Sequence, residues 1–281
     1  MTTGDQQPVA DDTAEEPKSA EPPRVANIVM DCIQRGDALQ LQQCFDDEEN
    51  PYHAEVGELL NRRDENGKAP IDLACTMGKI TVLKLLLEKG ADTNIRDIEG
   101  KSPLDFACIL GRTAVVTELL ENETSPDSAT ARGYTALHRA AAWGQLDCIK
   151  CLVEHGADMQ MKTTHCERPR ETAMRYNRLE CAQYLDWAEA KHALVQLIRE
   201  TKETIEDPQK VLGRLTKDDK MTGINACTEK QEWLDVTEDP TIDDFIQQKK
   251  ALDEILEPIH VKLSEPPPEK PHRRGTVISL S

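Results

Sequence analysis

No stretch of this 281-residue sequence approaches the roughly 18 uninterrupted apolar residues that a membrane-spanning helix needs. Its first residues also lack the basic start and the apolar run of a secretory signal. These two absences argue against membrane insertion and against secretion. We therefore expect a soluble, cytoplasmic protein.

Basic residues are scarce relative to acidic ones. The chain has 34 lysine and arginine residues against 52 aspartate and glutamate residues, which gives a formal net charge of −18. Such a charge repels phosphate backbones and disfavours a broad nucleic-acid-binding surface. We therefore expect no nucleic acid among the partners.

Both ends of the chain have little apolar material to bury. Residues 1–24 are rich in aspartate and glutamate, which predicts a disordered acidic tail. Residues 264–281 are rich in proline, which predicts a flexible tail. Folded structure is therefore expected between residues 25 and 263.

The usual signatures of catalysis are missing. The sequence contains no glycine-rich phosphate loop, serine elbow, His-Glu-x-x-His or calcium-loop pattern. Its nine cysteines are an odd number and fall at helical, apolar positions, so reduced thiols fit better than a disulfide framework. We expect neither an enzyme nor a bound cofactor.

A period of 33 residues organises the middle of the chain. It aligns the segments APIDLAC, SPLDFAC and TALHRAA, which begin at residues 69, 102 and 135. Two sets of glycines recur at the same interval, and these are Gly67, Gly100 and Gly133, then Gly78, Gly111 and Gly144. The pattern resembles the ankyrin repeat family, whose signature is T-P-L-H-x-A. One helix pair cannot bury its apolar face alone, so neighbouring pairs must stack.

The repeats predict where the array begins and ends. Three clear repeats cover residues 66–97, 99–130 and 132–163, and a degenerate fourth covers 166–187. In the fourth repeat Asn177 replaces the glycine between the helices and tolerates the left-handed conformation. An atypical helix pair before the first repeat caps the array, which is therefore expected over residues 25–187.

Two cysteines raise the question of a metal site. Cys148 and Cys151 are three residues apart, and several histidines lie nearby, whereas a structural zinc ion needs four ligands at about 2.0–2.3 Å. The repeat register favours burial instead, because Cys148 aligns with Val82 and Val115. We interpret both cysteines as core residues and expect no metal. For His138, the family resemblance implies a structural role, bracing adjacent turns through hydrogen bonds.

The family resemblance also implies a surface for a protein partner. In ankyrin arrays the turns and the exposed positions of each first helix form a concave face. The corresponding protein-binding positions here are Lys68, Met77, Ile98, Lys101, Ile109, Leu110, Arg132, Tyr134, Trp143 and Tyr176. Four of them, Met77, Leu110, Trp143 and Tyr176, recur every 33 residues and are called the ladder below. Exposed apolar and aromatic side chains indicate an interface. The alternatives are that they pad neighbouring repeats or lie beneath the C-terminal helices.

Longer helical patterns replace the repeats over residues 188–263. The first helix is expected to end before Pro208, the second to begin at Thr216, and the third to run from Thr241 to Pro258. Three amphipathic helices with short links predict a small bundle. The segments LTKDDKMTGINACTEKQEWLD and IDDFIQQKKALDEILEPI resemble the helical lid of seventy-kilodalton heat-shock chaperones. The ATPase and peptide-holding domains of those chaperones have no counterpart here, so folding activity is not implied.

These observations predict an all-α protein, an ankyrin-repeat solenoid followed by a lid-like three-helix bundle. The function that fits is a non-enzymatic adaptor that binds a protein through the concave face. A second interpretation is a chaperone-associated regulator that acts through the bundle. A third is a structural component of a ciliary or cytoskeletal assembly. The order of the two modules resembles proteins associated with cilia and dividing cells, which implies a place in the cilium or midbody region.

Overall fold

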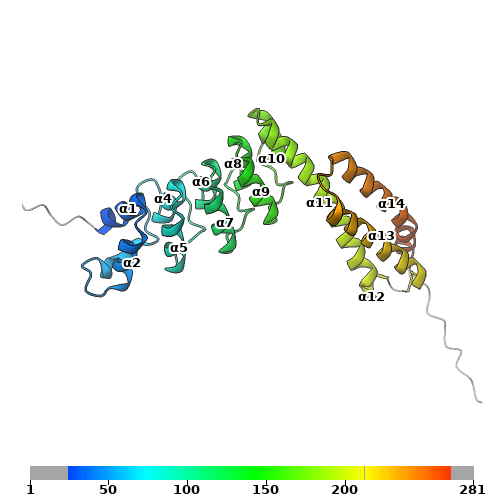
Figure 1. The fold of residues 1–281 in the computed structure, drawn as a ribbon, viewed down its shortest axis with the longest axis horizontal. Coiled ribbons are helices and arrows are strands. Elements are labelled where there is room, and N and C mark those ends of the chain that lie inside the picture. Colours follow the sequence, from blue (N-terminus) through cyan, green and yellow to red (C-terminus); the bar gives the residue numbers. More distant parts are fainter. Residues whose placement is uncertain (1–24, 212, 267–281) are drawn as a thin grey trace, which may run out of the picture. The chain divides into compact units, whose positions relative to one another are not determined.

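The computed structural model describes residues 25–211 and 213–266 (Figure 1). The predicted acidic tail and nearly all of the predicted proline-rich tail lie outside these ranges. Within them the chain forms fourteen helices and no strand, so the prediction of an all-α fold is confirmed. None of these helices combines the length and the apolar character that crossing a bilayer requires. The chain is divided into two compact units, and the boundary lies after Ala107.

The first unit begins with the atypical helix pair. Its helices are α1 (Val25–Arg35), α2 (Ala38–Asp46), α3 (His53–Leu59), α4 (Pro70–Met77), α5 (Ile80–Glu88) and the start of α6 (Pro103–Ile109). Helix α1 packs on α4 and α2 packs on α5, so the pair covers the apolar side of the first full repeat. Fully buried aliphatic side chains from both pairs, such as Ile33 and Leu83, form the core between them.

The second unit contains the later repeats and the bundle. Its helices are α7 (Thr113–Glu121), α8 (Ala136–Trp143), α9 (Leu146–Glu154), α10 (Pro169–Arg175), α11 (Leu179–Glu206), α12 (Pro208–Val211), α13 (Lys217–Val236) and α14 (Ile242–Ser264). Helix α8 packs on α9 and α10, and α7 packs on α9. Successive repeats therefore bury one another's apolar faces, as a solenoid requires.

Glycine recurs at these positions for two physical reasons. Gly78 and Gly144 end first helices with φ values of 70° and 78°, a region that side chains with a Cβ rarely adopt. Asn177 takes the same conformation at φ 57°, which confirms the expectation for the fourth repeat. A Cβ added at Gly133 would lie 2.9 Å from the carbonyl oxygen of Lys162, so the turn glycine allows the next turn to approach. The period thus follows from backbone geometry.

Two helices of the second unit run further than the sequence predicts. Helix α11 has 28 residues and joins the last helix of the fourth repeat to the first helix of the bundle without a break. Helix α14 continues through Pro258 to Ser264, so the expected end at Pro258 is wrong. Glu254 and Pro258 are both exposed, and water can therefore solvate the carbonyl group that the proline ring leaves without its helical donor.

The bundle has its own core around Phe245. This ring is fully buried and meets Trp187 of α11 and Trp233 of α13 edge to face, with centroids 5.6 and 5.7 Å away. The indole N–H of Trp187 donates a hydrogen bond to the carbonyl oxygen of Pro240 at 2.8 Å. These contacts fix α13 and α14 beside α11 (Figure 1) and use the apolar sides of all three helices.

Candidate functional site

The ladder residues occupy equivalent places, at or next to the end of each first helix. Their exposed fractions are 42% for Met77 in the first unit, and 43% for Leu110, 56% for Trp143 and 52% for Tyr176 in the second. Each directly precedes the residue in the left-handed conformation that turns the chain into the second helix. None of the four is sealed within its own unit. Large apolar and aromatic side chains of this exposure are the usual material of interfaces.

A side chain from the next repeat secures the end of the first helix beside the ladder. The side-chain amide of Gln145 donates to the carbonyl oxygen of Ile109 at 3.2 Å. In the next repeat, Nε of Arg178 donates to the carbonyl oxygen of Ala142 at 3.3 Å. Both carbonyl groups would otherwise lack a partner at a helix end. Neighbouring repeats thus hold the backbone at the Leu110 and Trp143 positions and leave those side chains pointing to solvent.

The other predicted binding positions differ in how available they are. Ile98 is 75% exposed, whereas Ile109 is half-buried. Lys68 and Lys101 are also half-buried, and their ammonium groups lie 4.9 and 5.8 Å from the centroid of the Phe106 ring. These two lysines are therefore already engaged with an aromatic face.

The predicted positions of the third and fourth repeats meet at Tyr134. The guanidinium of Arg139 lies 4.8 Å from the Tyr134 ring centroid, and Nη2 of Arg175 donates to the Tyr134 hydroxyl at 3.3 Å. Arg175 also stacks on Tyr176 at 4.9 Å and pairs with Glu167 at 3.2 Å. Arg139 was not among the predicted site residues. Its spacing of four from Trp143 on a helix is the signal that would have placed the two on one face.

His138 is fully buried and stabilises the turns next to Tyr134 through hydrogen bonds. Its Nδ1 accepts the backbone N–H of Thr135 at 3.2 Å, so the proton sits on Nε2, which donates to the carbonyl oxygen of Glu167 at 3.0 Å. Burial lowers the pKa of His138 and keeps the ring neutral. The histidine thus joins the cap of α8 to the next turn, as the family resemblance implies.

The family model for ankyrin repeats, three copies, matches residues 30–130, 73–163 and 122–192. This chain belongs to the ankyrin repeat family. Ankyrin arrays present extended surfaces to other proteins, so the repeats support a role in protein–protein interaction.

Matches to known proteins extend beyond the ankyrin repeats. "Ankyrin repeat domain-containing protein 45" of Homo sapiens is 34% identical over 253 residues, covering 90% of this chain and 82% of that protein. The protein of that name from Mus musculus is 42% identical over 252 residues, covering 90% and 88%. The Danio rerio protein is 44% identical over 111 residues, covering 40% and 50%. The two longer matches necessarily take in most of the C-terminal helices, and they confirm the family assignment made from the repeats.

The paired cysteines of the third ankyrin repeat lie in the core. Cys148 is fully buried and Cys151 is 7% exposed. Their sulfur atoms lie 3.6 and 3.3 Å from the hydroxyl groups of Thr113 and Thr117 on the preceding repeat. In the described ranges no group of three or more histidine, cysteine or carboxylate side chains is arranged to hold a metal ion. The two thiols contribute to the packing between repeats.

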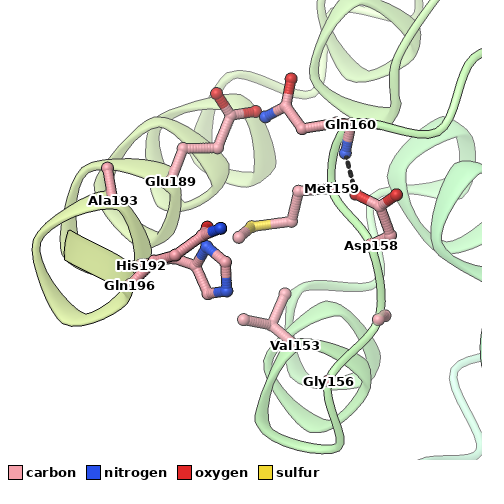
Figure 2. Close-up of a pocket in the computed structure, with 10 residues that line it drawn as sticks. Val153, Gly156, Asp158, Met159, Gln160, Glu189, His192, Ala193 and Gln196 are labelled. Atoms are coloured by element: carbon pink, nitrogen blue, oxygen red, sulfur yellow. Dashed lines mark hydrogen bonds between the residues drawn. The ribbon is translucent and has the colours of Figure 1, made fainter. Parts of the chain in front are cut away.

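A groove of about 440 Å³ lies between the turn after α9 and helix α11 (Figure 2). Met159 extends into it towards His192, and Glu189 stands at one end. Nη1 of Arg168 donates to Oε2 of Glu189 at 3.3 Å. The lining includes no serine, threonine or cysteine, so it offers no hydroxyl or thiol nucleophile. Its residues are those of the ankyrin turn and the long helix that packs beside it.

Proposed function

We propose that the chain is a non-enzymatic adaptor that binds a protein partner through the concave face of its ankyrin array. The observation that carries this proposal is the exposure of the ladder, 42–56% at four equivalent positions. Tryptophan and tyrosine are the residue types most enriched among interface hot spots. The next repeat holds the backbone beside Leu110 and Trp143 in place, so little backbone entropy is lost there when a partner binds.

The bundle gives the adaptor a stiff extension of its array. Helix α11 passes from the fourth repeat into the bundle, and charged pairs hold its first turns to α10. Arg170 binds Asp186 through two contacts of 2.7 and 3.1 Å. Arg168 contacts both Glu171 and Glu189. Bidentate arginine–carboxylate pairs are directional as well as strong, so the junction resists bending.

The proposal is tested by pull-down with the full chain and with the Leu110→Ala and Trp143→Ala variants. Loss of a hot-spot side chain weakens binding by about 2 kcal/mol, or roughly 30-fold, so each variant should lose the partners that the parent captures. Both side chains are exposed, so the free energy of unfolding should change by less than about 1 kcal/mol. Val236→Ala on α13, at 79% exposure, is the matched control and should retain every partner.

The same experiment distinguishes a ladder that binds a partner from a ladder that only packs against neighbouring repeats. If Trp143→Ala keeps its partners and lowers the free energy of unfolding by more than about 2 kcal/mol, the ladder supports neighbouring repeats. The adaptor proposal would then be wrong at this surface.

The likeness of the bundle to a chaperone lid favours a second function, a chaperone-associated regulator. In that role the full chain would bind a purified seventy-kilodalton chaperone reversibly, and salt would weaken the complex. A structural role in a ciliary assembly, which the module order favours by resemblance, would instead require harsh salt to extract the protein from axonemes. Binding that survives Trp143→Ala but depends on the bundle would favour the chaperone role over the concave-face adaptor.

A further inference from the structure

A basic region interrupts this acidic chain at the third and fourth ankyrin repeats. Residues 132–178 include eight lysine and arginine side chains against five aspartate and glutamate side chains, whereas the whole chain has a net charge of −18. Two of the arginines face aromatic rings, Arg139 that of Tyr134 and Arg175 that of the ladder residue Tyr176. The charge here is therefore opposite in sign to that of the molecule as a whole.

Arg139 carries an unmatched donor. Its side chain is half-buried, its guanidinium faces the Tyr134 ring at 4.8 Å, and its Nε is buried without a hydrogen-bond acceptor among the described residues. Trp143 follows four residues later on α8, so both side chains emerge from one side of the helix. A buried donor without an acceptor costs free energy. The part of this half-buried side chain that solvent reaches can pair with a carboxylate brought by a partner.

Arg175 approaches the same ring from the next repeat. It donates to the Tyr134 hydroxyl at 3.3 Å and stacks on Tyr176 at 4.9 Å. Its pairing with Glu167 at 3.2 Å leaves 41% of the side chain exposed. Stacking on the two tyrosines holds the guanidinium planes of Arg139 and Arg175 in place, which lowers the entropy lost when they bind a carboxylate.

Comparison with the preceding repeat shows that the unmatched charge is particular to this place. The positions of Arg132, Tyr134 and Arg139 correspond, 33 residues earlier, to Glu99, Lys101 and Phe106. There the cation lies over the aromatic ring and is paired with Glu99. In the third repeat an arginine replaces that glutamate. Arg132 is exposed, and the described residues provide no hydrogen bond or ion pair for its side chain.

We propose that Arg132, Tyr134, Arg139, Trp143, Arg175 and Tyr176, called the Tyr134 surface, bind an acidic segment of a protein partner. Carboxylate groups of the segment pair with the guanidinium groups, and one apolar side chain packs on Trp143 and Tyr176. Charge complementarity favours this occupant because guanidinium forks match carboxylates. The net charge of −18 repels a long polyanion such as nucleic acid. The inference rests on the proposed adaptor function and specifies its partner.

The test uses the full chain and a short fluorescein-labelled peptide of glutamates around a central tryptophan. Fluorescence anisotropy measures its affinity against that of the same peptide with glutamine in place of glutamate, and against oligothymidylate. The acidic peptide should bind at least about tenfold more tightly than either competitor, and about 0.5 M NaCl should weaken it strongly. Arg139→Gln and Arg132→Gln should each weaken binding about five- to tenfold.

Two variants keep this test interpretable. Arg199→Gln on α11 removes an exposed arginine that pairs with Glu203 one turn along the same helix, and this variant should bind the peptide as the parent does. Arg132→Gln removes a side chain for which the described residues provide no partner, so the fold of this variant should be unchanged even if Arg139→Gln destabilises the third repeat. Circular dichroism and a melting curve for each variant check this point.

Equal affinity for the glutamine peptide, tighter binding of oligothymidylate, or an equal loss in Arg199→Gln would overturn the inference. The pull-down with Leu110→Ala and Trp143→Ala tests the adaptor proposal separately. If Trp143→Ala loses the captured partner while Arg132→Gln and Arg139→Gln keep it, the adaptor proposal stands and the acidic partner is wrong. If all three variants keep the partner, both proposals fall.

Discussion

At the scale of single residues, one position near the start of each first helix shows how chemistry differs between repeats. His138 fills it in the third repeat as a neutral ring that bonds to the cap and to the next turn. Asp72 fills it in the first repeat, where Oδ2 accepts the backbone N–H of Ala69 at 2.8 Å. Its Oδ1 is buried without a hydrogen-bond partner among the described residues. The aspartate therefore caps its own helix at the cost of burying a charge.

Burial raises the pKa of Asp72 from 3.8 to about 6. Because the folded state holds this proton more tightly than the unfolded state does, its stabilising contribution is complete below about pH 3.8. That contribution is lost as the pH rises through about 6. Near neutral pH the folded protein therefore carries this buried carboxylate in its ionised form at a cost in folding free energy, whereas an asparagine here has no charge to bury.

We expect Asp72→Asn to gain stability relative to the parent as the pH rises from about 4 to about 7. A shift of roughly two pKa units corresponds to about 3 kcal/mol, and the extra amide N–H of asparagine lacks an acceptor, so a net gain of about 1–2 kcal/mol is expected. Urea unfolding at several pH values measures it. Asp253→Asn, on an exposed part of α14, is the control. A difference between Asp72→Asn and the parent that does not vary with pH would contradict the prediction.

At the scale of helices, the bundle depends on one glycine that lies in a helix interior. Gly223 is buried on α13, and an added Cβ would collide with Cδ1 of Ile205 and lie 3.1 Å from Cδ1 of Ile259. Glycine is normally unfavourable inside a helix by about 1 kcal/mol. Here its missing side chain lets α11 and α14 approach α13 closely.

Gly223→Ala should therefore lower the free energy of unfolding by about 1–3 kcal/mol, because overpacking outweighs the gain in helix propensity. Gly57→Ala on α3 is the matched control, since a Cβ there meets nothing within 4 Å. That control should raise stability by about 0.5–1 kcal/mol. Thermal and urea unfolding of both variants provide the comparison. Stabilisation by Gly223→Ala would mean that the three helices are less tightly packed than described.

The predicted helices were right where local rules decide them. Thr216 and Thr241 cap α13 and α14 with the side-chain oxygens that the capping pattern requires. The predicted end of α14 at Pro258 was wrong, because a helix tolerates a proline where the carbonyl group that loses its donor faces water. The sequence did not predict that α11 is continuous, because the change from the repeat pattern to the bundle pattern looks like a boundary. The helical backbone continues through this change, since its hydrogen bonds do not depend on which neighbours its side chains pack against.

At the scale of the whole molecule, the cysteines report on whether the repeats stay closed. All nine are free thiols, and eight of them are buried, leaving only Cys166 exposed. Cys148 donates or accepts hydrogen bonds with Cys108 and Thr113, and these bonds lower its pKa to about 7. A low pKa favours the reactive thiolate, yet a buried sulfur reacts only when the structure opens.

Under native conditions we expect iodoacetamide to add a single group, at Cys166, before any other cysteine reacts. In urea all nine should react. Intact-mass spectrometry counts the additions, and digestion locates them. The Cys166→Ser variant is the control and should remain unmodified over the same time. Early reaction at Cys148 would show that α9 separates from the repeat before it more readily than its burial implies.

The sequence by itself determined the repeats, their helices and the ladder, because a left-handed turn and a close backbone approach each require glycine at a fixed interval. The family resemblance assigned Tyr134, Trp143 and Tyr176 to the surface, and the structure leaves Trp143 and Tyr176 exposed and Tyr134 half-buried. Only the tertiary structure decided that Nε of Arg139 lacks an acceptor among the described residues, that Gly223 is a contact between helices, and that α11 joins array to bundle. These features depend on side chains far apart in sequence meeting in space, which local pattern does not encode.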